Sequence, residues 1–95
     1  MKIKLPVKYS TLTPAERKQV KEQYVLEQKE LCYHCNAPLS GPPEESVAKK
    51  KIKPKYYPKG FFGNPVHLHH NHVTDDTIGA VHNHCNAVLW EYYGE

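Results

Sequence analysis

The alternation of apolar and polar positions predicts one helix in the N-terminal third of the chain. Thr13 is followed by Pro-Ala-Glu, which supplies an N-cap, a proline at the first helical position and a glutamate that closes a capping box. After this start, Val20, Tyr24 and Leu31 make a narrow apolar stripe on an otherwise charged segment. We therefore predict a helix within residues 13–31 that packs along one face and leaves the other faces in water.

The segments on either side of this helix show weaker patterns. In residues 1–12, lysines alternate with apolar residues around a proline, so we predict an N-terminal arm that is either a short edge strand or disordered. Six of the eight prolines lie between positions 38 and 65, and proline excludes long helices and central strands. We predict an irregular loop over residues 40–65.

The last third of the chain has the pattern of a hairpin followed by a helix. Residues 66–69 alternate apolar and polar side chains, as a half-buried strand does. The turn composition of residues 73–77 leads to a second strand at 78–81, and residues 87–93 have the pattern of a short helix. We predict a ββα arrangement over residues 66–93. The side chains expected to fix its helix in the core are Leu89, Trp90 and Tyr93.

The size of the chain makes a further stabilising element necessary. With 95 residues there is room for one domain with a marginal core, and such small domains usually depend on disulfides or metal. Three cysteines cannot form a complete set of internal disulfides. No apolar run is long enough for a signal peptide or a membrane span. We therefore predict a single domain in the cytoplasm, with reduced thiols and bound metal.

Two matched spacings indicate a structural zinc site. Cys32 and Cys35 are separated by two residues, and His82 and Cys85 repeat this spacing further along the chain. Each pair places two ligands on one tight turn, and four ligands complete the tetrahedral shell of structural zinc. We predict that the domain is largely unfolded without zinc. The two histidines inside these pairs that are expected to point outward are His34 and His84.

The net charge of +3 conceals a strong separation of charge. Residues 49–59 carry six lysines and no acid, whereas residues 60–95 carry four acids and no lysine or arginine. The lysine-rich segment also contains aromatic residues, a combination that suits the phosphates and bases of a nucleic acid. The predicted DNA-binding residues are Lys49, Lys50, Lys51, Lys53, Lys55 and Lys59. The alternative is a solvated charge run in which Phe61 and Phe62 are core residues.

Histidines are concentrated in the predicted hairpin, since six of the seven lie between positions 67 and 84. The histidine pair that ends the first strand, the turn, the second strand and the Cys85-Asn86 step into a helix resemble the HNH (ββα-metal) endonuclease family. The likeness is greatest to its phage endonuclease VII type and covers residues 32–93 apart from the loop. The resemblance implies an α+β fold, a small zinc-stapled ββα-metal domain with an N-terminal helix, a long irregular loop and a zinc knuckle at residues 32–39.

The resemblance also implies roles for individual residues. His69 and Asn86 match the ligands of a catalytic divalent cation, and His70 matches the general base that deprotonates the attacking water. His72 shares the face of His70 and is the alternative base or a phosphate contact, while His67 is a spare ligand or second-shell donor. The endonuclease VII type has aspartate in place of His69. Imidazole with an amide oxygen favours Mn²⁺, Co²⁺, Ni²⁺ or Zn²⁺ as the catalytic cation, and Mg²⁺ completed by water and phosphate oxygens is the further alternative.

The predicted function is a metal-dependent endonuclease that nicks or cuts DNA. Imidazole is a base near neutral pH, and Arg17 is the only arginine, so we expect weak sequence specificity. We expect a monomer in the cytoplasm, that of the host if the chain is phage-encoded, with phage packaging proteins as possible partners. The alternatives are a non-catalytic zinc module that binds nucleic acid in packaging or regulation and, with less support, an enzyme acting on small molecules.

Overall fold

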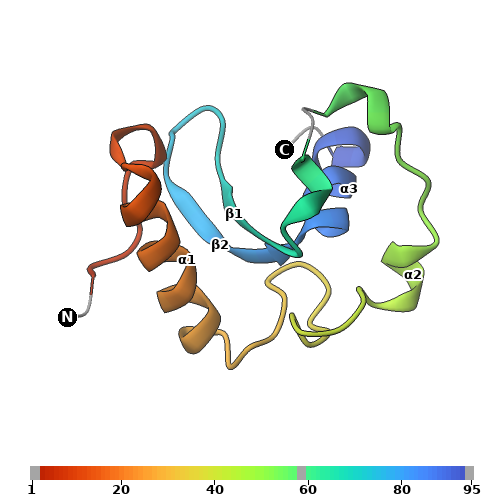
Figure 1. Cartoon of the computed structure of the whole chain (residues 1–95), viewed down its shortest axis with the longest axis horizontal. Coiled ribbons are helices and arrows are strands. Elements are labelled where there is room, and N and C mark those ends of the chain that lie inside the picture. The colour runs from red at the N-terminus through yellow and green to blue at the C-terminus, as the bar shows by residue number, and fades with distance from the viewer. Residues whose placement is uncertain (1–2, 58–59, 94–95) are drawn as a thin grey trace.

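A computed structural model describes residues 3–57 and 60–93 and has an α+β architecture, as predicted (Figure 1). A two-stranded antiparallel sheet lies between two helices, one near each end of the chain. The helices are α1 (Pro14–Glu27), α2 (Glu45–Ala48) and α3 (Asn83–Tyr93), and the strands are β1 (Val66–His70) and β2 (Thr77–His82). Short 3₁₀ turns lie at Tyr9–Thr11, Pro54–Tyr56 and Phe61–Gly63. No helix of the described segments is long and apolar enough to cross a membrane.

Helix α1 begins as predicted and ends earlier. The Thr13 hydroxyl accepts a hydrogen bond from the backbone N–H of Glu16, and the Glu16 carboxylate accepts one from the N–H of Thr13. The prediction that the helix extends to residue 31 is wrong, because Lys29 and Glu30 adopt positive φ angles of 57° and 64°. Two consecutive left-handed residues cannot continue a right-handed helix, and they turn the chain toward the cysteine knuckle.

The apolar stripe of α1 is shorter than the sequence pattern indicates. Val20 and Tyr24 are buried, at 1% and 8% exposure, whereas Leu31 is 37% exposed beyond the end of the helix. The Tyr24 hydroxyl lies 2.9 Å from the Thr77 hydroxyl of β2. Helix α1 therefore packs on the sheet through two of the three predicted positions.

The hairpin has a regular register from Val66 opposite His82 to His69 opposite Gly79, followed by an irregularity between His69 and His70. The observed strands are one or two residues longer than predicted. In the connecting turn, the side-chain oxygen of Asn71 accepts hydrogen bonds from the N–H groups of two residues, at 2.7 and 2.9 Å. A bulge of this kind increases the local twist and redirects side chains, here at the point where the histidine pair lies.

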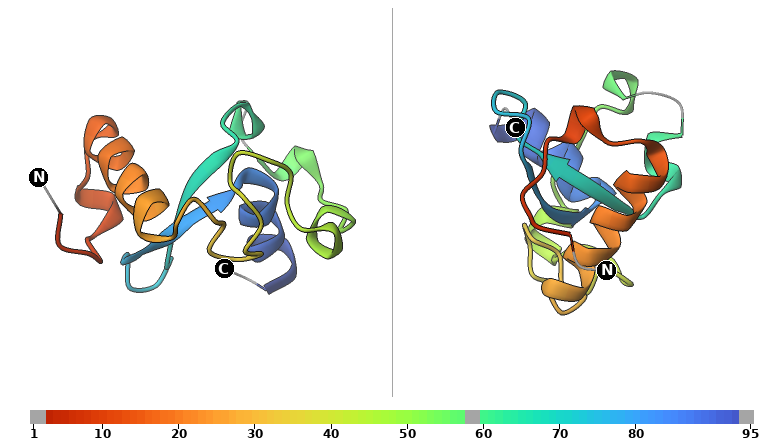
Figure 2. Two further views of the ribbon diagram at one scale, coloured as in Figure 1. Left: turned by 90° about the horizontal axis from the view of Figure 1, so that it is seen from below. Right: turned by 90° about the vertical axis from the view of Figure 1, so that its left-hand side faces the viewer.

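Residues 3–12 of the N-terminal arm are ordered along the hairpin (Figure 2), but they pair with it only through an isolated bridge between Lys8 and Asp76 and do not form the edge strand of the first alternative. Residues 1–2 lie outside the described residues. The N–H of Thr77 donates to the carbonyl of Val7 at 2.9 Å, and the N–H of Tyr9 donates to the carbonyl of Asp75 at 2.8 Å. Lys8 pairs with Asp76, with 2.9 Å between the charged atoms. Apolar residues of the arm pack against the core, so the arm is part of the fold.

Helix α3 begins four residues before the predicted start. Its first turn therefore contains Cys85, the last predicted zinc ligand, and Asn86. Leu89 is buried at 6% exposure, but Trp90 and Tyr93 are 45% and 56% exposed, so the prediction that both are core residues is wrong. The Trp90 ring instead meets the edges of the Tyr56 and Tyr57 rings at centroid distances of 5.8 Å. The outer face of α3 is thus covered only in part, by the loop.

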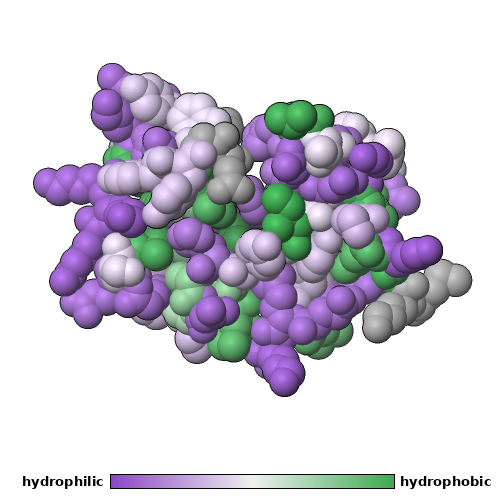
Figure 3. All heavy atoms as spheres, turned by 180° about the vertical axis from the view of Figure 1, so that it is seen from behind, coloured by the Kyte–Doolittle hydropathy of each residue, from purple (hydrophilic) through white to green (hydrophobic). Residues whose placement is uncertain are grey.

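In its described residues, 40–57 and 60–65, the predicted loop is irregular apart from α2 and two 3₁₀ turns. Figure 1 shows it passing around α3 before it returns to β1. The Val47 side chain is buried at 7% exposure, which anchors α2 against α3. The face opposite that of Figure 1 is mostly polar, with separate apolar patches (Figure 3).

Gly79 is the one glycine of the described residues whose added Cβ would meet atoms closer than 3.4 Å. That Cβ would lie 2.7 Å from Gln28 Oε1 and 3.1 Å from the Cβ of Tyr33. Gln28 has little freedom to move, because its side chain accepts from the N–H of Ala80 and donates to the carbonyl of Ala80, both at 2.9 Å. We expect Gly79→Ala to destabilise the protein by about 1–3 kcal/mol, the usual cost of overpacking, in urea unfolding of the zinc-loaded protein.

Gly63→Ala is the matched control for this prediction. A Cβ at Gly63 has no heavy atom within 4 Å, so this variant should be neutral or slightly stabilised by its restricted unfolded state. Equal stability of the two variants would contradict the close packing of β2 against the knuckle.

Candidate metal centre and histidine cluster

Four predicted ligands meet at the base of the hairpin. Their ligand atoms all lie within 4.8 Å of one another, and the four residues are Cys32, Cys35, His82 and Cys85. The Nδ1 atom of His82 is 3.4 Å from the Cys35 sulfur and 3.6 Å from the Cys85 sulfur. In tetrahedral zinc sites, bonds of about 2.3 Å to sulfur and 2.0 Å to nitrogen place these atoms roughly 3.5 Å apart. The residues therefore lie close enough to bind a metal such as zinc.

Three elements place these ligands. The turn after Cys32 is closed by a hydrogen bond from the N–H of Asn36 to the carbonyl of Cys32, at 3.0 Å. Asn36 has a φ of 62°, a conformation that asparagine tolerates better than most residues. The N–H of Tyr33 then donates to the carbonyl of Ala80 at 2.9 Å, which fixes the knuckle on β2. His82 ends β2 and Cys85 lies in the first turn of α3.

The orientation of His82 suits metal binding through Nδ1. Its Nε2 donates to the carbonyl of Pro38 at 2.9 Å, so the proton is on Nε2 and the lone pair of Nδ1 faces the sulfurs. Metal-binding histidines commonly use their second nitrogen in this way. A hydrogen bond from the Cys85 thiol lowers the pKa of Cys32 to about 4, and the same bond raises the pKa of Cys85. One thiolate is thus already stabilised before a cation binds.

Neither His34 nor His84 belongs to this ligand group among the described residues. Both rings are half-buried, so they are outside the cluster without being fully exposed. His84 Nε2 donates to the carbonyl of Val47 at 3.0 Å and so holds α2 on α3. The ring of His34 lies 6.1 Å from that of Tyr93.

His67 is the histidine that contacts Asn86 directly. Its Nε2 donates to the carbonyl of Phe61 at 2.8 Å, and its Nδ1 accepts from the side-chain amide of Asn86 at 3.1 Å. Burial lowers the pKa of His67, which keeps the ring neutral at pH 7. The sequence indicated only a spare metal ligand or a hydrogen-bond donor to a ligand at this position, and in the structure the Nδ1 lone pair of His67 is engaged by the Asn86 amide.

His70 and His72 are stacked on each other beyond the bulge. Their ring centroids are 4.7 Å apart, and the other face of His70 lies parallel to Tyr9 at 3.8 Å. Burial, and next the positive charge that His72 can carry, lower the pKa of His70. The neutral ring that results is the form that accepts a proton. The contact with Tyr9 was missed from the sequence, because it depends on the docked arm.

The predicted catalytic and metal-binding residues line two different pockets. His72 and Asn86 line a pocket of about 280 Å³ together with loop aromatic residues and Trp90. His69 is 3% exposed and lines a second pocket, of about 370 Å³, with His34 and Leu89 among its neighbours. Direct contacts thus connect His67 with Asn86 and His70 with His72, whereas His69 lies deeper in the hairpin.

The predicted DNA-binding lysines surround exposed aromatic rings. Lys50 lies 5.2 Å above the ring of Tyr92, and Lys53 and Lys55 lie 5.6 and 5.7 Å from the Tyr56 centroid. Lys51 is exposed, while Lys49 pairs with Glu45 on the surface at 3.0 Å. Lys59 lies outside the described residues. A pocket of about 450 Å³ lies where this segment meets the outer face of α3, beside the hydrogen bond from the N–H of Lys53 to the Glu91 carboxylate at 2.9 Å.

The alternative prediction made Phe61 and Phe62 core residues of a solvated lysine segment, and the structure agrees with it only in part. Phe61 is half-buried and Phe62 is 38% exposed. The two rings pack on each other and on Tyr57, at centroid distances between 4.6 and 5.5 Å. They form an aromatic cluster under the loop, next to His67.

Comparisons with known proteins do not place the chain in a family. No family model matches it, and no curated protein or solved structure is similar to it at the level compared.

Proposed function

We propose that the protein is a metal-dependent endonuclease of the HNH type that hydrolyses phosphodiester bonds of DNA. The observation that carries this proposal is the contact between the hairpin and α3. The hairpin residue His67 accepts a hydrogen bond from the side chain of Asn86 at 3.1 Å. Asn86 directly follows Cys85, one of the four residues of the zinc-type cluster. The ββα order and the position of Asn86 in the first turn of α3 agree with what the HNH resemblance implies.

The residues proposed to hold a catalytic cation are Asn86 and His67, which are in contact. His69, the ligand that the resemblance implies, lines a separate pocket and would have to turn toward Asn86 to join them. The Nδ1 atom of His67 carries a lone pair because Nε2 donates to a backbone carbonyl, an arrangement common in metal ligands. Imidazole and amide donors suit Mn²⁺ and Ni²⁺, and Mg²⁺ binds where phosphate oxygens and water complete its shell. The bound cation supplies charge stabilisation to the phosphate and to the leaving oxygen.

The base in this proposal is His70, and His72 contacts the phosphate. The lowered pKa of His70 keeps its ring neutral and able to take a proton from water. The rings of Tyr9 and His72 cover both of its faces, which limits its orientation. His72 is exposed and shares a pocket with Asn86, a location suited to a phosphate that approaches the cation.

The non-catalytic alternative is a zinc module that binds nucleic acid. The lysines and exposed rings of Tyr56 and Trp90 favour it, because such a surface binds phosphates and stacks on bases without chemistry. This surface serves equally in a nuclease. The histidines beside Asn86 are what the alternative leaves unexplained.

A plasmid assay separates the two functions. Zinc-loaded protein is incubated with supercoiled plasmid and Mg²⁺, Mn²⁺ or Ni²⁺, and the relaxed and linear forms are measured on a gel. We expect nicking with at least one cation and none when catalytic cations are omitted. Asn86→Ala should abolish nicking while DNA binding remains. Intact plasmid with every cation, from a protein that binds DNA, would establish the non-catalytic module instead.

A further inference from the structure

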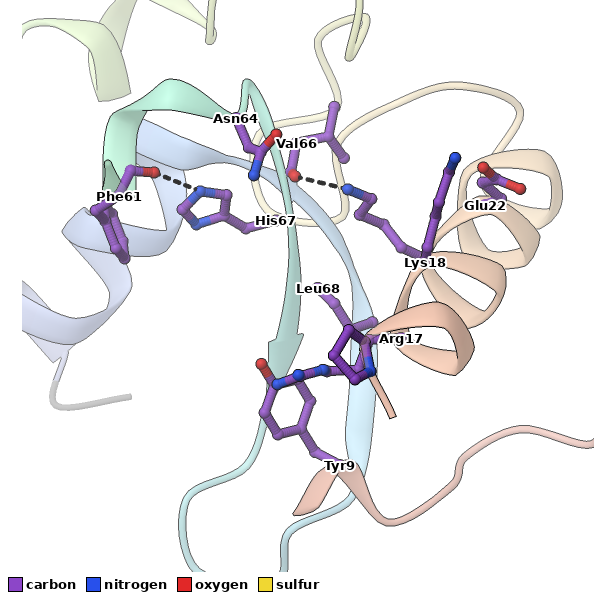
Figure 4. Close-up of a pocket in the computed structure, with 11 residues that line it drawn as sticks. Tyr9, Arg17, Lys18, Glu22, Phe61, Asn64, Val66, His67 and Leu68 are labelled. Carbon is purple, nitrogen blue, oxygen red and sulfur yellow. Dashed lines mark hydrogen bonds between the residues drawn. The ribbon is translucent and has the colours of Figure 1, made fainter. Parts of the chain in front are cut away.

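A second basic surface lies between α1 and β1, away from the lysine-rich loop. It is a groove of about 590 Å³, lined on one side by α1 and on the other by β1 and the turn before it. Figure 4 shows the side chains that line it, with Tyr9 and Arg17 at one end and Phe61 and His67 at the other. The sequence did not reveal this groove, because charges are nearly balanced along α1.

The charge of the groove comes from one turn and a half of α1. Arg17, Lys18 and Lys21 all line it, and Glu22 is the only acid among the lining residues. Residues three and four apart on a helix lie on the same side, so Arg17 and Lys21 face the groove together. The Lys21 ammonium lies 3.4 Å from the carbonyl of Val66, which brings its charge to the edge of β1.

The aromatic rings of the groove are already in contact with other side chains. Tyr9 is covered by the His70 ring at 3.8 Å on one side, and the Arg17 guanidinium carbon lies 5.5 Å from its centroid. Phe61 is packed against other rings of the aromatic cluster and against His67 at 4.5 Å. Base stacking needs an open ring face, so this groove suits the sugar-phosphate backbone and differs from the surface around Tyr56 and Trp90.

The two ends of the groove contact the two pairs of residues to which catalytic roles are assigned, His70 with His72 and His67 with Asn86. Tyr9 stacks on His70, the proposed base. His67, at the opposite end, bonds to Asn86. A backbone lying in the groove would therefore follow β1 along the residues to which the catalytic roles are assigned.

We propose that this groove binds the phosphodiester backbone of duplex DNA through Arg17, Lys18 and Lys21, without reading its sequence. The inference rests on the proposed function in taking DNA as the polyanion, and it adds a binding site to the lysine-rich loop. Each lysine that neutralises a phosphate releases counterions, which gives the binding constant a steep dependence on salt. Two lysines of the groove account for about 2 units in the slope of log K against log salt.

The test compares charge-matched double variants of the zinc-loaded protein. The probe is a fluorescein-labelled DNA duplex, and its anisotropy is measured over a range of salt without added catalytic cation. Lys18→Gln with Lys21→Gln should weaken binding at low salt about tenfold or more and reduce the salt slope by about 2. Lys18→Arg with Lys21→Arg should bind as the wild type does. The control, Lys4→Gln with Lys29→Gln, removes the same charge from exposed positions outside the groove lining.

The outcomes distinguish this proposal from the proposed function. If the groove variant keeps the affinity and slope of the control, the groove is not a DNA site, whatever the plasmid assay shows. If the groove variant loses affinity while wild-type protein leaves plasmid intact with every cation, the groove is supported and the nuclease proposal fails. Equal losses in the groove variant and the control would also overturn the groove, because they would reflect net charge alone.

Discussion

Removal of zinc is expected to unfold the domain. Structural zinc contributes about 10–16 kcal/mol of apparent binding free energy in small modules, which is comparable with the total stability of an ordinary domain, about 5–15 kcal/mol. The cluster joins the knuckle, the end of β2 and the start of α3, so its loss frees all three. Elemental analysis should find about one zinc per chain, and chelation should abolish the helical circular dichroism signal.

Cys85→Ser should reproduce the effect of chelation, because serine does not supply a thiolate. His34→Ala is the control, since His34 lies within the knuckle and outside the ligand group. Zinc should also be released on acidification, because protons compete with the cation for the thiolates. A protein that stays folded and zinc-free after chelation would refute the role of the metal in folding.

Replacement of His70 by alanine is expected to lower the single-turnover rate of DNA cleavage by about 10²- to 10⁴-fold, the usual contribution of a general base. His72→Ala should have a smaller effect, because His72 is assigned to phosphate and its pocket is open. DNA affinity, measured without catalytic cation, should remain within a few fold in His70→Ala. This separation of binding from chemistry is the signature of a base.

The comparison of the two histidines is decisive because they are stacked. If His72→Ala loses more activity than His70→Ala, the roles are reversed. If both variants cut DNA at the wild-type rate, the proposed base is wrong. His84→Ala serves as the matched histidine control, since its ring bonds to Val47 on the other side of α3.

The zinc-type cluster was predictable because its signal is local. Two ligands separated by two residues can be recognised from spacing alone, and both pairs fall where the structure places them. The early end of α1 was not predictable, because it depends on two residues with positive φ that lack the usual glycine. Tertiary contacts, here the attachment of the knuckle to Ala80, determine that turn.

The sequence showed which histidines lie in the hairpin, but it did not show how all of their side chains are arranged. Strand alternation placed His70 and His72 on one face, and their rings do stack. The partner of Asn86 could not be derived in this way, because the contact with His67 depends on how α3 packs against β1. The contact of Tyr9 with His70 is more remote still, since it requires the arm to dock along β2. Trp90 was misassigned because its apolar surface is covered by loop residues and not by the sheet.

The outer edge of β2 has a consequence for self-association. The N–H of Thr77 donates a hydrogen bond to the carbonyl of Val7 in the arm. The Gln28 side chain bonds to both the N–H and the carbonyl of Ala80. The same carbonyl accepts a hydrogen bond from the N–H of Tyr33 in the knuckle. Exposed strand edges are where copies of a protein add to one another and aggregate. A second copy that paired with β2 would first have to displace the arm, a helix-end side chain and the knuckle. The same contacts that attach the arm and the knuckle to β2 therefore also protect this edge of the sheet from pairing with a second copy.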